Sequence, residues 1–413
     1  MLLAVLTAVQ FCHILDFVIL MPLGPQLMRA FDLLPRQFAL LVSAYTFSAA
    51  LAGLFAALVM DRFDRKRMLL VLLAGFGVGT LLCGLATSFA LLMAARVAAG
   101  AFGGVLAGVV FAIVGDQIPP ERRGRATGVV MAGFSAASVL GLPLGLSVAE
   151  RYDWHAPFIL LAAITGGVVL VGALALPSMR GHLSAPRGRS PFGDLWRVAR
   201  EPAHLRAFGF TTALMFAGFT VIPFLSPYLT SNAGVPETRL DLIYLVGGLA
   251  TLFTGPAMGW LADRFGHARV FTAAALVSIL PILAVTNLAP IPLPWVLTVT
   301  TLMMVMASGR MISATALVTG VVDPARRGSF MSLNAAVQQG AAGLATFVAG
   351  LMIGRAADGR MLGYAWVGAL AIAANVLTLW LVRRLRAVRA PERELDAGAP
   401  DVAAPLEAPR RAG

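Results

Sequence analysis

The sequence predicts an all-α integral membrane protein in which twelve transmembrane helices form two six-helix, pseudo-symmetric bundles. Three observations predict this class: the composition, a series of long apolar runs and an internal repeat. Of the 413 residues, 59% are hydrophobic and 13% are charged, whereas soluble domains average about 45–50% and about 25%. The mean hydropathy is +0.83. Because a water-soluble fold needs polar groups on its surface, this composition excludes an ordinary cytosolic enzyme, a disordered protein and a secreted module.

Twelve apolar runs are long enough to cross a membrane, since a helix spans the roughly 30 Å hydrocarbon core with about 20 residues. They lie at Leu2–Met21, Phe38–Met60, Met68–Thr87, Ala90–Gly115, Ala126–Ala149, Pro157–Leu176, Ala207–Leu229, Leu240–Ala262, Val270–Ala289, Trp295–Val322, Ser329–Ile353 and Gly363–Val382. The first run contains Asp16 and has no basic residue before it. We therefore expect a retained span rather than a cleaved signal peptide, and a native chain that starts further upstream.

Basic residues between the runs predict the orientation, because Lys and Arg collect in cytoplasmic loops. With the N-terminus inside, the inner segments contain 24 Lys and Arg residues and the outer segments contain 6. Without the C-terminal segment 383–413 the inner number is still 17. Both termini are therefore expected to be cytoplasmic. The formal net charge of +12 then reflects membrane topology, and we expect no nucleic-acid partner.

The second half of the chain repeats features of the first half at a spacing of 201 to 204 residues. The repeated features are Asp61-Arg62 with Asp263-Arg264, Arg122-Arg123-Gly124 with Arg326-Arg327-Gly328, and Pro22 and Pro25 with Pro223 and Pro227. An even number of spans in each half makes the repeats parallel, related by an axis along the membrane normal. We expect an N-terminal bundle over 1–177, a cytoplasmic linker over 178–206, a C-terminal bundle over 207–382 and a disordered cytoplasmic tail over 383–413. A short interfacial helix is expected within Pro191–Arg206.

Two loops resemble a signature of the major facilitator superfamily, G-x-L-x-D-R-x-G-R-K/R-x. The second half has it as Gly259-Trp260-Leu261-Ala262-Asp263-Arg264-Phe265-Gly266. The first half retains Asp61, Arg62, Arg65 and Lys66 but has Ala57, Val59 and Asp64 in place of Gly, Leu and Gly. In the fourth span, Arg96 and Gly100 match the family pattern R-x-x-x-G. The resemblance covers essentially the whole chain and implies the MFS fold and transport by alternating access.

The first and fifth spans indicate a branch of that superfamily. Asp16 in the first span, followed by Met21-Pro22, resembles the proton-coupled drug and sugar efflux branch, which includes arabinose-efflux-like proteins. The fifth span meets the Gly-Pro antiporter signature only in part, because Leu142 separates Gly141 from Pro143.

Small residues recur every four positions in the fourth and fifth spans. They are Gly100, Gly104 and Gly108 in the fourth span, and Gly133, Ala137, Gly141 and Gly145 in the fifth. Small residues allow helices to approach closely in lipid. These stripes are either packing contacts or a sliding contact for rocking of the two halves.

The signature loops also have two interpretations. Their basic residues serve topology and solvation, or, as the resemblance implies, the loops form a cytoplasmic charge-relay latch. In that second interpretation Asp61, Arg62 and Arg65 act with Asp263 and Arg264. Asp64 adds a carboxylate to the first loop that would alter the latch.

Ionisable residues inside the spans are the main functional candidates, because a charged group at a helix centre costs about 2.5–3.5 kcal/mol on insertion scales. The candidates are Asp16, Arg96 and Arg310, with His13 beside them. Gln10, His13 and Asp16 share one face of the first helix. Counting about 1.5 Å per residue, Asp16 lies roughly 20 Å from the inner start of its span and Arg96 roughly 9 Å from the outer start of its own, so the two reach similar depths.

An Asp16–Arg96 pair would be either a structural ion pair or a proton-coupling site. A carboxylate that loses its cationic partner in a low dielectric takes up a proton more readily. His13 is either a satisfied polar residue or a proton or substrate contact. Arg310 is either paired across the cavity or a contact for a polar or anionic substrate group. Asn334, Gln338 and Tyr45 are further cavity candidates, for which simple interhelical contacts are the alternative.

The sequence lacks the residue patterns of ATP binding, metal binding and catalysis. Lys66, the single lysine, has no G-x-x-x-x-G-K-S/T around it, so we expect no ATP site. The five histidines and two cysteines, Cys12 and Cys83, show no metal-ligand spacing and no disulfide framework. We expect no cofactor, no metal and no catalytic residue, and therefore no enzyme.

These features together predict a secondary active transporter of the inner (plasma) membrane that moves a drug-like, sugar or metabolite substrate by alternating access. Proton-coupled efflux, or antiport, is the expected mode, and the bilayer, protons and the substrate are the expected partners of a functional monomer. One alternative is a proton symporter or facilitator for uptake. An alternative of another class is a non-transporting membrane receptor or lipid-handling factor, against which the loop signatures in both halves argue.

Overall fold

The computed structural model describes residues 1–181, 191–322 and 326–385 of the chain. Within these ranges twelve helices or helix series are long and apolar enough to cross a membrane. The expected number of spans is therefore confirmed. The expected tail lies almost entirely outside the described residues.

Each half of the chain supplies six spans. The first six are α1 (Leu2–Ile19), α3 (Pro35–Val59), α4 (Arg65–Gly84), α5 (Phe89–Gln117), the series α6 (Pro120–Ala136), η2 (Ala137–Gly141) and α7 (Leu142–Arg151), and α8 (His155–Ala175). The last six are α10 (Pro202–Phe219), α12 (Leu240–Phe265), α13 (His267–Thr286), α14 (Leu293–Thr319), α15 (Arg327–Met352) and α16 (Tyr364–Val382).

Short elements lie between the spans, at the two ends of the bundles. They are α2 (Gly24–Ala30), η1 (Met60–Arg62), α9 (Pro191–Arg200), η4 (Ile222–Phe224), α11 (Leu225–Ser231), η5 (Glu237–Arg239), β1 (Gly354–Arg355) and β2 (Met361–Leu362). The two strands form an antiparallel hairpin in which Gly354 pairs with Leu362 and Arg355 with Met361. This small hairpin is an addition to the expected all-α architecture.

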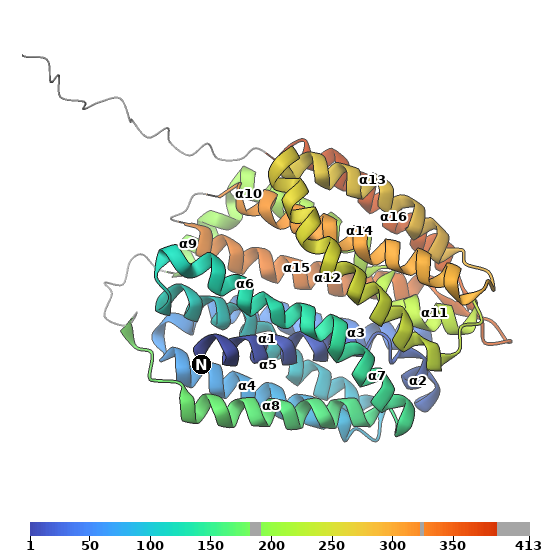
Figure 1. Cartoon of the computed structure of the whole chain (residues 1–413), viewed down its shortest axis with the longest axis horizontal. Coiled ribbons are helices and arrows are strands. Elements are labelled where there is room, and N and C mark those ends of the chain that lie inside the picture. The colour runs from blue at the N-terminus through green and yellow to red at the C-terminus, as the bar shows by residue number, and fades with distance from the viewer. Residues whose placement is uncertain (182–190, 323–325, 386–413) are drawn as a thin grey trace, which may run out of the picture.

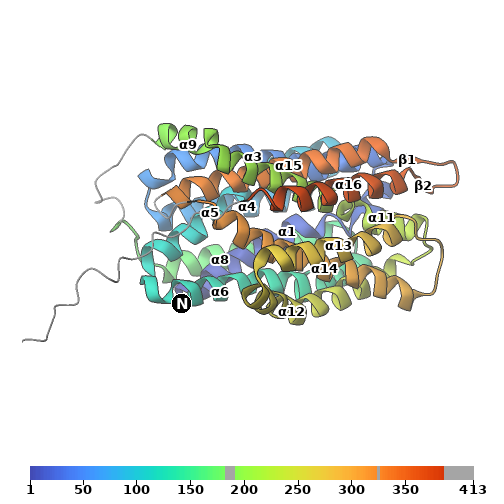
Figure 2. The ribbon, with the colours of Figure 1, turned by 90° about the horizontal axis from the view of Figure 1, so that it is seen from above.

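The N-terminus and α9 lie at one end of the molecule, and α2, α7 and α11 reach the opposite end (Figure 1). We call these the linker end and the far end. The basic-residue count predicts that the linker end faces the cytoplasm. Figure 2 shows the spans running along the length of the molecule, with the β1–β2 hairpin at the far end.

Prolines follow the first span of each half, α1 and α10, at the positions that repeat between the halves. Pro25 occupies the first turn of α2 and Pro223 that of η4, positions where a missing backbone N–H costs no helical hydrogen bond. Helix α1 stops at Ile19 and α10 at Phe219, shortly before Pro22 and Pro223, whose rings in a continued helix would clash with the carbonyls of Val18 and Phe219. Each span is followed by a short helix at the far end. These two repeat-related helices, α2 and α11, pack against each other.

A proline also sets the boundary between the linker helix, which lies within the expected range, and the C-terminal bundle. Helix α9 ends at Arg200, and α10 begins at Pro202, before the expected start of the C-terminal bundle. Glu201 between them is extended, with φ −68° and ψ 125°, because the residue before a proline is disfavoured in the helical region. Residues Pro202–Arg206 therefore belong to the seventh span.

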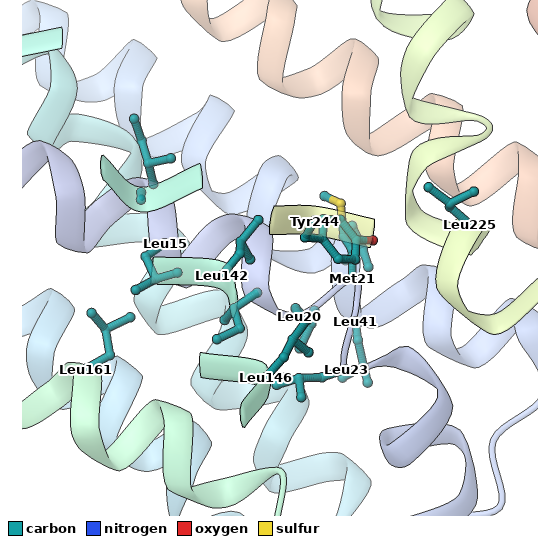
Figure 3. Close-up of a cluster of buried hydrophobic side chains, with 14 of the residues drawn as sticks. Leu15, Leu20, Met21, Leu23, Leu41, Leu142, Leu146, Leu161, Leu225 and Tyr244 are labelled. Carbon is teal, nitrogen blue, oxygen red and sulfur yellow. The ribbon is translucent and has the colours of Figure 1, made fainter. Parts of the chain in front are cut away.

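The two halves share one apolar core at the far end. A single cluster of buried side chains includes Leu20, Met21 and Leu146 of the first half and Leu225 and Tyr244 of the second (Figure 3). A second cluster, around Phe208 and Phe330, contains residues of α9 and the C-terminal half alone. The hydrophobic contact between the halves is therefore concentrated away from the linker end.

Candidate functional site

The centre of the N-terminal bundle contains a fully buried ion pair between Asp16 of α1 and Arg96 of α5. Arg96 Nη1 lies 2.9 Å from Asp16 Oδ2, and both side chains are at most 1% exposed. Thr80 of α4 donates its hydroxyl to Asp16 Oδ1 at 3.0 Å. Asp16 and Arg96 thus meet as their similar depths predict, and Thr80 is a further partner that the sequence did not indicate.

Aromatic side chains connect this ion pair with the boundary between the halves. The guanidinium of Arg96 lies 4.4 Å from the ring centroid of Tyr45. The Tyr45 ring packs on Phe17 at 5.5 Å, and Phe17 packs on Phe219 of α10 at 5.9 Å. Asp16 and Phe17 are adjacent, so one helix places the carboxylate inside its bundle and the neighbouring ring against the other bundle.

Several buried polar atoms of α1, α3 and α5 have no hydrogen-bond partner among the described residues. They are the Tyr45 hydroxyl, Arg96 Nε, both ring nitrogens of His13 and Gln10 Oε1. Tyr45 is fully buried and is therefore not exposed to a cavity in this conformation. His13 faces the ring of Phe76 on α4, while Gln10 lies beside Gly133 on α6. Gln10, His13 and Asp16 are all buried; His13 and Asp16 both contact α4, whereas Gln10 contacts α6.

Arg310 lies inside the C-terminal bundle. Its Nη1 donates to Asn375 Oδ1 of α16 at 2.7 Å, and Asn375 in turn donates to the carbonyl of Ala275 on α13 at 2.7 Å. Among the described residues no acidic side chain lies within ion-pair distance of Arg310. In this conformation Arg310 contacts its own bundle, and Asn375 is a partner that the sequence did not indicate.

The polar residues of α15 also make contacts within their own bundle. Asn334 accepts a hydrogen bond of 2.8 Å from Thr211 of α10. The Gln338 amide nitrogen lies 3.9 Å from Met311 Sδ on α14. Asn334 is buried and Gln338 is partly exposed, so Gln338 is the more accessible of the two cavity candidates.

The glycine stripes hold helices of the N-terminal bundle together. A methyl group added at Gly100 or Gly104 would overlap α3, and one added at Gly141 or Gly145 would overlap side chains of α1. Gly108, by contrast, has open space around it. These glycines therefore provide packing within one bundle, whereas the bundles approach each other closely at Gly248, Gly343 and Gly350, which the sequence argument missed.

Pro143 produces a local change in helix type. It has no backbone N–H, and its ring clashes with the carbonyl four residues before it, Val139. The chain forms a π-helical turn over Ala137–Gly141, next to this proline. The backbone carbonyl of Ser138 in that turn lies against Gly248 of α12. The partial Gly-Pro motif therefore lies at a contact between the bundles.

The two signature loops differ in geometry. In the second loop Gly266 has φ +94°, a conformation that L side chains rarely adopt. In the first loop Asp64 has φ −55° and caps α4 by accepting from the backbone N–H groups of Lys66 and Arg67. Asp64 also accepts from Ser178, Met179 and Arg180. Asp64 therefore connects the start of α4 to residues 178–180 at the end of the first bundle. This structural role differs from its expected role in a latch.

The gating candidates contact residues of their own bundle. Arg65 is buried and its Nε lies 2.9 Å from Asp116 Oδ2, a partner missing from the sequence argument. Asp263 lies 3.6 Å from His267 Nε2, one turn further along, and the Arg264 guanidinium lies 5.2 Å from the Trp260 ring centroid. Arg62 is exposed, and the side chain of Asp61 lies outside the described residues.

The far end has ion pairs between the bundles. Arg29 of α2 pairs with Glu237 through both guanidinium nitrogens, with Nη2 to Oε2 at 2.8 Å. Arg355 Nη1 lies 3.4 Å from Asp32 Oδ1. Within the described ranges, no group of three or more His, Cys, Asp or Glu side chains is placed to hold a metal ion.

Two bundles of six spans, related by a repeat and joined by a linker, define a secondary-transporter fold. The sequence profile of the Major Facilitator Superfamily matches residues 6–225 and 207–412. The chain therefore belongs to the Major Facilitator Superfamily, and it is a multi-pass membrane protein and not an enzyme.

Similar proteins agree with this family. The chain is 29% identical over 263 residues to the uncharacterized MFS-type transporter YceJ of Bacillus subtilis, covering 63% of this chain and 66% of YceJ. It is 25% identical to a probable sugar efflux transporter of Helicobacter pylori (61% and 63% covered) and 24% identical to the putative transporter AraJ of Escherichia coli (59% and 60%). The matches thus span less than two thirds of these relatives. They support the arabinose-efflux-like branch.

A solved structure supports the fold. The nucleoside transporter NupG superposes with a TM-score of 0.74 at 16% identity, covering 93% of this chain and 98% of that one. At this identity the likeness is one of architecture.

Proposed function

We propose that this protein exports a small molecule across the plasma membrane, as a functional monomer, in exchange for protons. Asp16 is the proton-binding group in this proposal. The observation that carries it is the fully buried Asp16–Arg96 pair, which lies one residue from the contact of Phe17 with the other bundle. A movement between the bundles displaces Phe17 and Tyr45 and thereby changes how Arg96 meets the carboxylate.

The repeat supports a coupling role over a purely structural one. At the spacing of the proline anchors, Asp16 corresponds to Ala217 or Gly218 in the seventh span. The shared scaffold therefore forms without a carboxylate at this place. An ionisable residue that the scaffold does not require, at a depth where charge is costly, is a functional residue by default.

Efflux is the proposed direction because relatives named as probable sugar efflux transporters are among the matches. A sugar or a metabolite of similar size is accordingly the proposed substrate class. Uptake by proton symport or facilitation is the alternative within the same fold. Gating at the linker end is proposed for Asp61, Arg62, Arg65, Asp263 and Arg264, which would meet across the bundles once that end closes.

Transport in proteoliposomes tests the coupling. The purified protein is assayed with a panel of sugars and metabolites, once with an imposed pH gradient and once for substrate exchange without one. In Asp16→Asn, exchange should persist while gradient-driven transport is lost. Glu150→Gln, an equal chemical change at an exposed acid of α7, should leave both activities intact. If Asp16→Asn retains gradient-driven transport, Asp16 is not the coupling acid. A folded variant without either activity would indicate a structural role instead.

A further inference from the structure

An apolar groove lies between the bundles at the linker end. It has a volume of about 320 Å³ and is lined by Leu51, Leu54, Phe55 and Leu58 of α3, by Leu195, Trp196 and Ala199 of α9, and by Leu333 of α15. The four α3 residues follow the i, i+3, i+4, i+7 pattern of one helix face. Leu51, Phe55 and Trp196 are more than half exposed.

The groove arises because α3 and α15 diverge toward the linker end. A methyl group added at Gly350 or Gly343 would overlap α3, so the helices touch there. At Gly340 the same methyl would lie 3.9 Å from Ala50 Cβ, an ordinary contact. One turn and more beyond, the side chains of Leu54, Leu58 and Leu333 are separated by the groove. Helix α9, which packs on both α15 and α3, forms the third wall.

The end of α9 beside the groove is basic. Arg200 is in the last turn of α9 and is exposed. Its guanidinium lies 4.2 Å from the ring centroid of Trp196, so the positive charge is held at the edge of an apolar wall. An occupant that matches both features has a hydrocarbon chain and an adjacent negative charge. In a membrane protein the surrounding bilayer supplies such a molecule.

We propose that the groove binds an acyl chain of an anionic phospholipid, whose phosphate is recognised by Arg200. The groove has walls from both bundles. The bound acyl chain therefore acts as a wedge that favours the conformation in which the two bundles are separated at the linker end. The wedge effect rests on the alternating-access mechanism proposed above. Binding itself does not, and it is measured without transport.

Fluorescence quenching by brominated lipids measures the binding, because Trp196 lines the groove. The full chain is placed in nanodiscs of phosphatidylcholine containing brominated phosphatidylglycerol or brominated phosphatidylcholine. The Trp196 signal is the difference between the native protein and Trp196→Phe. We expect phosphatidylglycerol to be preferred about fivefold, the factor given by one basic residue near an anionic lipid. Arg200→Gln should reduce that preference to about one.

Filling the groove provides a second test. Ala199→Phe places a ring in the groove and should abolish quenching of Trp196 by both lipids. Ala175→Phe, the same change at an exposed position at the end of α8, should not. Quenching that is equal for both lipids in the native protein, or that survives in Ala199→Phe, would overturn the proposal.

Spin labels report the wedge effect. Labels at Gly128→Cys of α6 and Gly259→Cys of α12 lie in different bundles, at positions with open space around them. Phosphatidylglycerol should increase the population with the longer label distance, and Ala199→Phe should remove this response. A lipid that binds without changing the distances would refute the wedge and leave the binding site standing. If Asp16→Asn retained gradient-driven transport, the proposed coupling role of Asp16 would be overturned, and neither lipid measurement would be affected.

Discussion

At the scale of single residues, the interior of the N-terminal bundle depends on satisfying one buried carboxylate. Asp16 receives its hydrogen bonds from Arg96 and Thr80. Removing one member of a buried ion pair typically costs about 3–5 kcal/mol, because the other charge is left uncompensated. The neutral partner, Thr80, allows the environment of Asp16 to be changed without removing a charge.

Thr80→Val keeps the shape of the side chain and removes the hydroxyl that donates to Asp16. The protein should lose about 1–3 kcal/mol of stability, the cost of a buried acceptor left without its donor. Thr80→Ser retains a donor and should lose less. Thermal unfolding of the purified protein in detergent measures both. A Thr80→Val protein as stable as the native protein would show that this hydrogen bond contributes nothing measurable.

Asp64 provides a pH-dependent contribution outside the spans. Burial opposes its ionisation, but hydrogen bonds from Ser178, the Met179 and Lys66 amides and Arg180 outweigh that effect and hold the pKa of Asp64 well below its usual range. A carboxyl with a depressed pKa in the folded state stabilises the fold above its unfolded pKa of about 3.9. The contribution is lost as the pH falls from there through the folded-state value.

Asp64→Asn keeps an oxygen at the N-cap but removes the charge, and should therefore lower stability at neutral pH by about 1 kcal/mol, the difference between hydrogen bonds to a charged and to a neutral group. The difference from the native protein should shrink below about pH 4. Unfolding of both proteins across this pH range measures it. Asp153→Asn, which changes an exposed cap of α8, is the matched control. A difference that stays constant down to the lowest pH would contradict the assignment.

At the scale of elements, the length of the apolar runs predicts the spans, whereas two prolines account for the departures from the expected elements. Runs of about twenty apolar residues leave a membrane helix few alternatives, so the twelve spans follow from the sequence. Helix α10 begins at Pro202 and not at Ala207 as expected. The π turn lies next to Pro143, and no hydrophobic periodicity indicates it. Asp16 and Arg96 were predicted to meet because each is a charge at a known depth.

Partners that are neutral or far apart in sequence could not be predicted. Thr80, Asn375 and Thr211 are polar residues of ordinary type in membrane helices, and their roles depend on which helix faces which. The glycines between α3 and α15 were missed for the same reason. A small residue indicates a close contact, but not with which helix.

The contact between α3 and α15 allows an element-scale prediction. Gly350→Val places a side chain where even a methyl group overlaps Ala39, and overpacking of this kind costs about 1–3 kcal/mol. Gly340→Ala should be neutral or stabilising, because it meets Ala50 at an ordinary distance and removes a flexible residue from a helix. Thermal unfolding compares the two variants. A tolerated Gly350→Val would show that the helices separate easily at the far end.

At the scale of the whole molecule, the conformation has its inter-bundle contacts at the far end. The second-half side chains of the shared apolar cluster, the α2–α11 contact and the two ion pairs all lie there. The charged residues of the linker-end loops pair within their own bundles. With the orientation expected from the basic residues, the proposed transport cycle would have a cytoplasmic substrate enter in this state.

The Arg29–Glu237 pair should bias the molecule toward that state. Exposed ion pairs contribute about 0–1 kcal/mol, and about 1 kcal/mol changes a two-state population ratio roughly fivefold. Arg29→Glu should therefore increase the population that is open at the far end. The exchanged pair Arg29→Glu with Glu237→Arg should restore the native distribution, and Arg151→Gln, a change of an exposed arginine at the same end, should not alter it. Spin-label distances across the far end measure the populations at low salt, where screening is weakest. If Arg29→Glu and the exchanged pair give the same distances, the ion pair does not hold the far end closed, and the apolar cluster alone accounts for its closure.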